Sequence, residues 1–123
     1  MQREGRVILD TSAIFAYIQK EKGYEIVQGL LARSAMSAVN VSEVVAVLTN
    51  IGTSEEEINI VIQECIPNII DFDESIASLA GKLIKHSKEF GLSLGDRSCI
   101  ATGVVKGMEI YTADKIWEKL NIE

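Results

Sequence analysis

Short apolar runs alternate with segments of helical periodicity along the chain, and this alternation limits the possible folds more than any other feature. The runs at 6–10, 35–39, 68–72 and 108–112 have the length and composition of buried strands. Helical spacing of apolar residues predicts helices at 13–19, 24–32, 41–51, 55–65, 74–90, 96–106 and 114–120. This order of elements predicts an α/β fold of three layers: a short parallel sheet of four to five strands with helices on both faces.

Polar residues and glycines at the helix ends set these boundaries. Ser54 and Glu57 have the spacing of a capping box, which predicts the start of a helix. Asp73 is expected to cap the longest helix, which would run unbroken to a stop at Gly91. Asp96 is expected to open the next helix, with Gly95 before it as a residue that lets the backbone turn tightly.

The chain composition indicates one compact domain over residues 1–123. It contains 123 residues and one proline, and its glycines and serines never cluster into a linker, so a single core is expected. It has no apolar run long enough to span a bilayer and no charged-then-apolar leader, which predicts a cytoplasmic protein without membrane contact. Cys65 and Cys99 lack the spacing of a metal pair and are interpreted as small buried apolar residues.

The net charge of −6 argues against a protein that holds nucleic acid passively, because phosphate contacts need lysine and arginine. An acidic chain still fits a nuclease if part of its charge forms a metal site. Four carboxylates that hold two divalent cations would bring the net charge to about −2.

Four acids lie at, or within one turn of, the starts of predicted helices: Asp10, Glu43, Asp96 and Asp114. In open parallel sheets the helix starts lie along the edge formed by the carboxyl ends of the strands, where ligands bind. Carboxylates gathered there repel one another unless a cation compensates them. No histidine or cysteine accompanies them, so the set suits Mg²⁺ or Mn²⁺ and, with it, phosphoryl chemistry.

Each acid also has a purely structural interpretation. Asp10 fits as the N-cap of a helix that begins near Ser12, and Asn40 and Glu43 have capping-box spacing. Asp96 and Asp114 are favourable residues for a first helical turn. The presence of all four acids at helix starts is what favours a metal site.

Four segments of the chain together resemble the PIN domain, specifically the VapC-type toxins of bacterial and archaeal toxin–antitoxin pairs. The segments are VILDTSAIFAYI, SAVNVSEVVAVL, LSLGDRSCIATG and YTADKIW, which occur in the family's order and anchor nearly the whole chain. The resemblance implies a metal-dependent endoribonuclease that cuts RNA. It also implies a homodimer that a cognate antitoxin holds inactive.

The resemblance assigns roles to individual residues. Asp10 and Asp96 match central metal ligands, while Glu43 and Asp114 match acids that complete the cluster directly or through water. Ser12 and Thr112 match hydroxyls that support the site by hydrogen bonding, and Asn40 matches a family asparagine that is also expected to cap its helix. Arg97 adjoins Asp96 and is a candidate contact for RNA phosphate, with an ordinary solvent-facing charge as the alternative.

Two other functions stay open on the sequence alone. A PIN fold without catalytic activity would serve as a binding scaffold. A receiver-type phosphoacceptor domain also has about this length and binds Mg²⁺, but it needs paired acids at the first strand, where only Asp10 stands.

Overall fold

The structure is a computed structural model that describes residues 5–113, apart from the side chain of Lys88. Its four strands are β1 (Val7–Leu9), β2 (Ser34–Ser37), β3 (Ile69–Ile70) and β4 (Glu109–Tyr111). They form one sheet in the order β3-β2-β1-β4 and pair in parallel throughout, so that Ile8 lies between Ala35 and Ile110. The predicted parallel α/β sheet is confirmed, whereas the helix expected at 114–120 lies outside the described residues.

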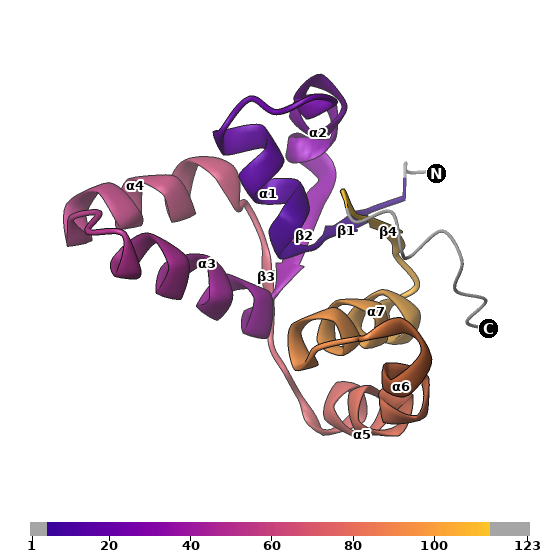
Figure 1. Ribbon diagram of the computed structural model, residues 1–123. Helices are drawn as coiled ribbons and strands as arrows, with labels where there is room; N and C mark the ends of the chain where they lie inside the picture. The colour runs from indigo at the N-terminus through magenta and orange to yellow at the C-terminus, as the bar shows by residue number, and fades with distance from the viewer. Residues whose placement is uncertain (1–4, 114–123) are drawn as a thin grey trace.

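The helices cover both faces of this sheet. They are α1 (Thr11–Ile18), α2 (Tyr24–Leu30), α3 (Ala38–Asn50), α4 (Glu55–Cys65), α5 (Glu74–Lys82), α6 (Ser87–Phe90) and α7 (Leu94–Lys106). Short 3₁₀ turns follow α2 at Leu31–Arg33 and α5 at Leu83–His86. Figure 1 shows α1 to α4 on one side of the sheet and α5 to α7 on the other, which confirms the three layers.

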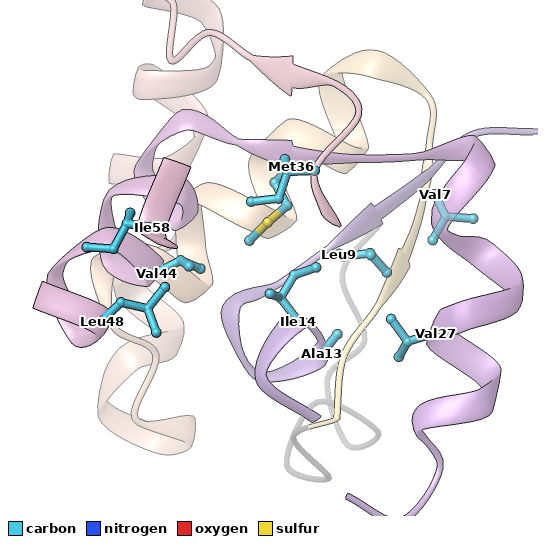
Figure 2. Close-up of a cluster of buried hydrophobic side chains, with 10 residues drawn as sticks. Val7, Leu9, Ala13, Ile14, Val27, Met36, Val44, Leu48 and Ile58 are labelled. Atoms are coloured by element: carbon cyan, nitrogen blue, oxygen red, sulfur yellow. The ribbon is translucent and has the colours of Figure 1, made fainter. Parts of the chain in front are cut away.

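The central strand β1 divides the core between the two faces, because successive side chains of a strand point in opposite directions. Val7 and Leu9 pack with Met36 and with apolar residues of α1 to α4, as Figure 2 shows. Ile8 points the other way, against Ala35 of β2 and Cys99 of α7. Both faces of β1 are therefore buried, as expected for the middle of a parallel sheet.

The two cysteines differ in exposure, and neither forms a disulfide. Cys99 is fully buried, as predicted. Cys65, the last residue of α4, is only partly buried against the core. None of the helices within residues 5–113 is long and apolar enough to cross a membrane.

The prediction of one long helix over 74–90 is wrong. The chain leaves α-helical geometry after Lys82, passes through a 3₁₀ turn and ends in the four-residue α6. In a continuous α-helix the Ala80 carbonyl would accept the N–H of Ile84, but here Nη1 of Arg97 donates to this carbonyl at 3.1 Å. A donor from α7 thus satisfies a backbone acceptor at the end of α5. The longest described helices are α3 and α7, with 13 residues each.

Two predicted helix starts also need correction. Helix α3 begins at Ala38 with Ser37 as its N-cap, so Asn40 lies inside the helix and does not cap it. Helix α7 begins at Leu94 with Ser93 as its N-cap, so Asp96 is the third helical residue and not the first. In both cases a serine hydroxyl directly before the helix accepts a backbone N–H from its first turn, which is the favoured capping geometry. The predicted caps at Ser54 and Asp73 are confirmed.

Candidate functional site

The first turns of α1, α3 and α7 meet at one edge of the sheet, the edge formed by the carboxyl ends of β1, β2 and β4. Asp10 follows β1 directly and caps α1, while Thr112 follows β4, the neighbour of β1. Helix α3 continues from β2 without a connecting loop. The parallel sheet therefore brings segments about 30 to 100 residues apart in the chain to one place.

Asp10 is the most buried acid of this edge, with only 4% of its surface exposed. Its carboxylate accepts hydrogen bonds from the Ala13 N–H at 2.9 Å, the Ser12 hydroxyl at 2.9 Å and the Thr112 hydroxyl at 2.5 Å. Ser12 and Thr112 thus lie where supporting hydroxyls were predicted. Burial raises the pKa of Asp10 above its ordinary value, and the nearby Asp96 charge raises it further, although the three hydrogen bonds oppose the shift.

Glu43 lies in α3 and accepts hydrogen bonds from one residue of α1 and one residue of its own helix. The Thr11 hydroxyl donates to its Oε1 atom at 2.6 Å, and the Asn40 amide donates to the same oxygen at 3.1 Å. The hydroxyl and the amide together fix the carboxylate between α1 and α3.

Asn40 connects the three helices at this edge. Its side chain is 1% exposed, and its amide nitrogen lies within 3.2 Å of both the Thr11 hydroxyl and the Gly95 carbonyl. Its side-chain oxygen accepts the Ser37 hydroxyl at 2.9 Å. Every polar atom of the buried amide is therefore bonded, as such groups require.

Asp96 lies in the first turn of α7 and completes a capping box. Its Oδ2 atom accepts the Ser93 N–H at 2.9 Å, and the Ser93 hydroxyl accepts the Asp96 N–H at 3.1 Å. The side chain is half-buried, unlike that of Asp10. The structural interpretation of this acid is thus confirmed, while its role as a metal ligand stays a prediction.

The Cys99 thiol is buried one turn further along α7 than Asp96. Burial raises the pKa of Cys99 well above its usual range, and the carboxylates of Asp10, Asp96 and Glu43 raise it further, in that order. Hydrogen bonds join the three segments that carry these acids, because Thr11 donates to Glu43 and Asn40 donates to the Gly95 carbonyl. The fourth predicted acid, Asp114, lies outside the described residues.

The described acids do not form a complete metal centre by themselves. Within residues 5–113, no three acidic, cysteine or histidine side chains are arranged to hold a metal ion. Each of the three carboxylates instead accepts hydrogen bonds from its surroundings. Their donor atoms are all oxygens, which is the ligand chemistry of Mg²⁺ and Mn²⁺.

Arg97 makes its described hydrogen bond to the Ala80 carbonyl of α5, and its Nε atom is buried without a partner among the residues that the structure describes. Its role as an RNA contact stays a prediction. Two residues at the site differ from the predictions: Thr11 had no predicted role, and Gly95 was expected only to allow a tight turn. The position of Thr11 between Asp10 and Ser12 was the only available signal.

Comparison with known proteins identifies the family to which this sequence is similar. The model of the PIN domain family matches residues 7–123. None of the curated proteins is significantly similar in sequence to the chain.

Several solved structures have the same fold. A toxin–antitoxin complex from Klebsiella pneumoniae contains a chain that is 22% identical, with a TM-score of 0.69 over 93% of this chain and 92% of that one. VapC20 of Mycobacterium tuberculosis, a toxin that cleaves the sarcin–ricin loop, is 14% identical, with a TM-score of 0.68 over 88% and 89%. FitAcB from Neisseria gonorrhoeae is 20% identical, with a TM-score of 0.64 over 89% and 88%.

Proposed function

The chain belongs to the PIN domain family, as its four motifs predicted, and from this premise we propose that it is a metal-dependent endoribonuclease. One observation carries the proposal: Asp10, Glu43 and Asp96 come from three separate segments that hydrogen bonds join at the ligand-binding edge of the sheet. Thr11, next to Asp10, donates to Glu43, and Asn40 donates to the carbonyl of Gly95, next to Asp96. A fold gains no stability from placing three like charges together. Their convergence supports a role that uses the charge.

The chemistry of these residues fits a small divalent cation. Mg²⁺ keeps several water ligands and is commonly bound through one or two carboxylates, so it needs no cage of three protein side chains. Asp10 and Asp96 would bind it directly, while Glu43 and Asp114 would complete the site directly or through water. A bound cation of this kind polarises a phosphodiester and lowers the pKa of a water molecule.

The chain's own residues prepare the acids for this role. Ser12 and Thr112 hold the Asp10 carboxylate in one orientation, since both hydroxyls donate to it. Thr11 and Asn40 do the same for Glu43. Asp96 lies in the first turn of α7, and its carboxylate is oriented by the Ser93 N–H. Carboxylates that are already ordered lose less conformational freedom when they bind a ligand.

The substrate and the partners of this activity follow from the relatives. We infer that the substrate is RNA, because one structural relative is a toxin that cleaves the sarcin–ricin loop. Another relative is part of a toxin–antitoxin complex, which supports a toxin role with an antitoxin as partner. The homodimer, implied by the family resemblance, and the cytoplasmic location, expected from the sequence, remain predictions.

A second candidate is a PIN fold that binds partners without catalysis. It is favoured by the hydrogen bonds that already engage all three described carboxylates. The receiver-type alternative is not retained, because the chain belongs to the PIN domain family.

Cleavage of a panel of tRNA and rRNA fragments in Mn²⁺, Mg²⁺ or a chelator separates the two candidates. The endoribonuclease cuts at least one RNA in a metal-dependent way, and the chelator abolishes the cut. Glu43→Gln should slow this cleavage strongly, whereas Glu64→Gln, on the exposed surface of α4, should not. No cleavage in any metal would favour the scaffold.

A further inference from the structure

Gly95 occupies a position where its backbone does not need glycine. It is the second residue of α7, and unlike Gly91 and Gly107 it has no positive φ angle. The expectation that it allows a tight turn is therefore wrong. Glycine inside a helix makes the helix less stable than alanine does, so the presence of glycine at position 95 needs another explanation.

The space beside Gly95 is filled by the carboxylate of Glu43. A Cβ atom built on Gly95 would lie 2.5 Å from the carboxyl carbon of Glu43 and 2.5 Å from its Oε1 atom, and closer still to Oε2. Oε1 is the oxygen that Thr11 and Asn40 bind. Even a single methyl group at position 95 would thus displace the carboxylate from both donors.

The first turns of α3 and α7 are pressed together at this point. The Asn40 amide donates to the Gly95 carbonyl at 3.2 Å, so the backbone of α7 is itself bonded to the side chain that orients Glu43. The other helical glycines differ: a Cβ atom at Gly29 or Gly81 would meet nothing within 4 Å, and one at Gly103 would meet the core residue Ile110. Among the described glycines, Gly95 alone borders a carboxylate of the candidate site.

We propose that Gly95 is a positioning residue, whose missing side chain leaves the space in which the Glu43 carboxylate accepts the hydrogen bonds of Thr11 and Asn40. The role of that carboxylate in metal binding rests on the proposed function, but the packing of Gly95 against Glu43 does not. Because Glu43 is a flexible side chain, Gly95→Ala moves the carboxylate and leaves the fold intact.

Thermal unfolding of a set of variants tests the packing without any assumption about function. Gly81→Ala, the matched control in an exposed helical position, should raise the Tm by about 3 °C through helix propensity alone. Gly95→Ala should give no such gain, because it breaks the hydrogen bonds of Glu43. In a Glu43→Ala background the space is empty, and Gly95→Ala should then raise the Tm as Gly81→Ala does.

The comparison has clear outcomes. If Gly95→Ala raises the Tm equally with and without Glu43, the proposed packing is wrong. If Gly95→Ala alone fails to fold, recovery of the fold in the double variant supports the proposal, and failure of the double variant overturns it.

Binding of Mn²⁺, followed by the electron paramagnetic resonance signal of the free ion, tests the positioning role. Loss of an orienting partner typically weakens metal binding by about 10- to 100-fold, which is the increase in Kd expected for Gly95→Ala. The same substitution in the Glu43→Ala background should leave the Kd unchanged, and so should Gly81→Ala. An equal loss in both backgrounds would show that Gly95 acts on the fold and not through Glu43. A wild-type protein that binds no Mn²⁺ would contradict the proposed metal site, while the unfolding comparison would still decide the packing.

Discussion

Two capping boxes in this chain have the same local geometry and different surroundings. At the start of α4, the Ser54 hydroxyl accepts the Glu57 N–H at 3.1 Å and Glu57 accepts the Ser54 N–H at 3.4 Å. At the start of α7, Ser93 and Asp96 make the same reciprocal pair at 3.1 and 2.9 Å. Both serines are exposed N-caps, and both acids are third helical residues.

The difference lies in what the acid meets beyond its own helix. Glu57 is exposed and lies next to Glu55 and Glu56 in the same first turn, where water screens their charges. Asp96 is half-buried at the edge of the sheet, where its charge adds to the effect of burial in raising the pKa of Asp10 and of the Cys99 thiol. A capping motif therefore predicts where a helix begins, but it does not predict a function for its acid. The position of Asp96 at the edge of the sheet is what suggests a functional role.

The largest expected difference between the two boxes is in RNA cleavage. Asp96→Asn removes the charge but keeps an oxygen that accepts the Ser93 N–H, so the helix start should persist. Partners of metal ligands are typically worth about 10- to 100-fold in activity, and a ligand itself should cost more than about 100-fold. Glu57→Gln is the matched control and should cleave at the wild-type rate. Equal rates for the two variants, measured with Mn²⁺ on the best RNA substrate, would mean that Asp96 only caps α7.

The next largest effect concerns Asn40, which bonds to the first turn of α7. The capping box at the start of α4 has no such residue beside it. Asn40→Ala leaves the Gly95 carbonyl and the Glu43 carboxylate without a shared donor, which should cost about 1–3 kcal/mol of unfolding free energy. Cleavage should fall by about 10- to 100-fold at the same time, because Glu43 loses its orientation. Chemical denaturation and initial cleavage rates measure the two effects. Asn50→Ala, at the exposed end of α3, is the control, and a loss as large in that variant would argue against a specific role.

Asp10 should give a smaller effect on stability, with a sign that depends on pH. Its pKa is raised in the folded protein, so protonated Asp10 favours folding at low pH. This contribution is fully present below the ordinary value of 3.8 and is lost as the pH rises through the raised folded value. Asp10→Asn is neutral at every pH and should therefore be more stable than the wild type at neutral pH in metal-free buffer. Urea unfolding at several pH values measures the difference, and a variant less stable at pH 7 would contradict the assigned cause of the shift.

The two serines should show the smallest difference. Ser54→Ala and Ser93→Ala each remove one capping hydroxyl and should each cost about 1 kcal/mol of unfolding free energy. Their effects on stability should match because the two caps have the same geometry. Thermal unfolding of both variants is the measurement, and a cost at Ser93 several times that at Ser54 would mean that the hydroxyl serves the site as well as the helix.

The sequence predicted the sheet and the shared edge of the segments that carry Asp10, Glu43 and Asp96, because both follow from local patterns. Alternating strands and helices imply a parallel sheet, and acids at the helix starts then share one edge. Asp10 was correctly predicted as the cap of α1, since only its own helix decides that role.

Three of the errors concern residues whose roles depend on distant partners. Asn40 was expected to cap α3, but Ser37 caps it, and the Asn40 side chain instead binds Thr11 and Gly95, which lie 29 and 55 residues away. The break after α5 coincides with the bond from Arg97, 17 residues further along. The space that Gly95 leaves for Glu43 has no local signature, because nothing near position 95 in the sequence predicts which side chain will fill it.

Calorimetric titration with Mn²⁺ of the wild type, Asp96→Asn and Glu57→Gln tests the central claim most directly. The proposed site predicts that the wild type and Glu57→Gln bind Mn²⁺ with the same Kd, that Mg²⁺ competes, and that Asp96→Asn binds more than about 100-fold more weakly. Equal binding by all three proteins, or no binding by the wild type, would contradict it.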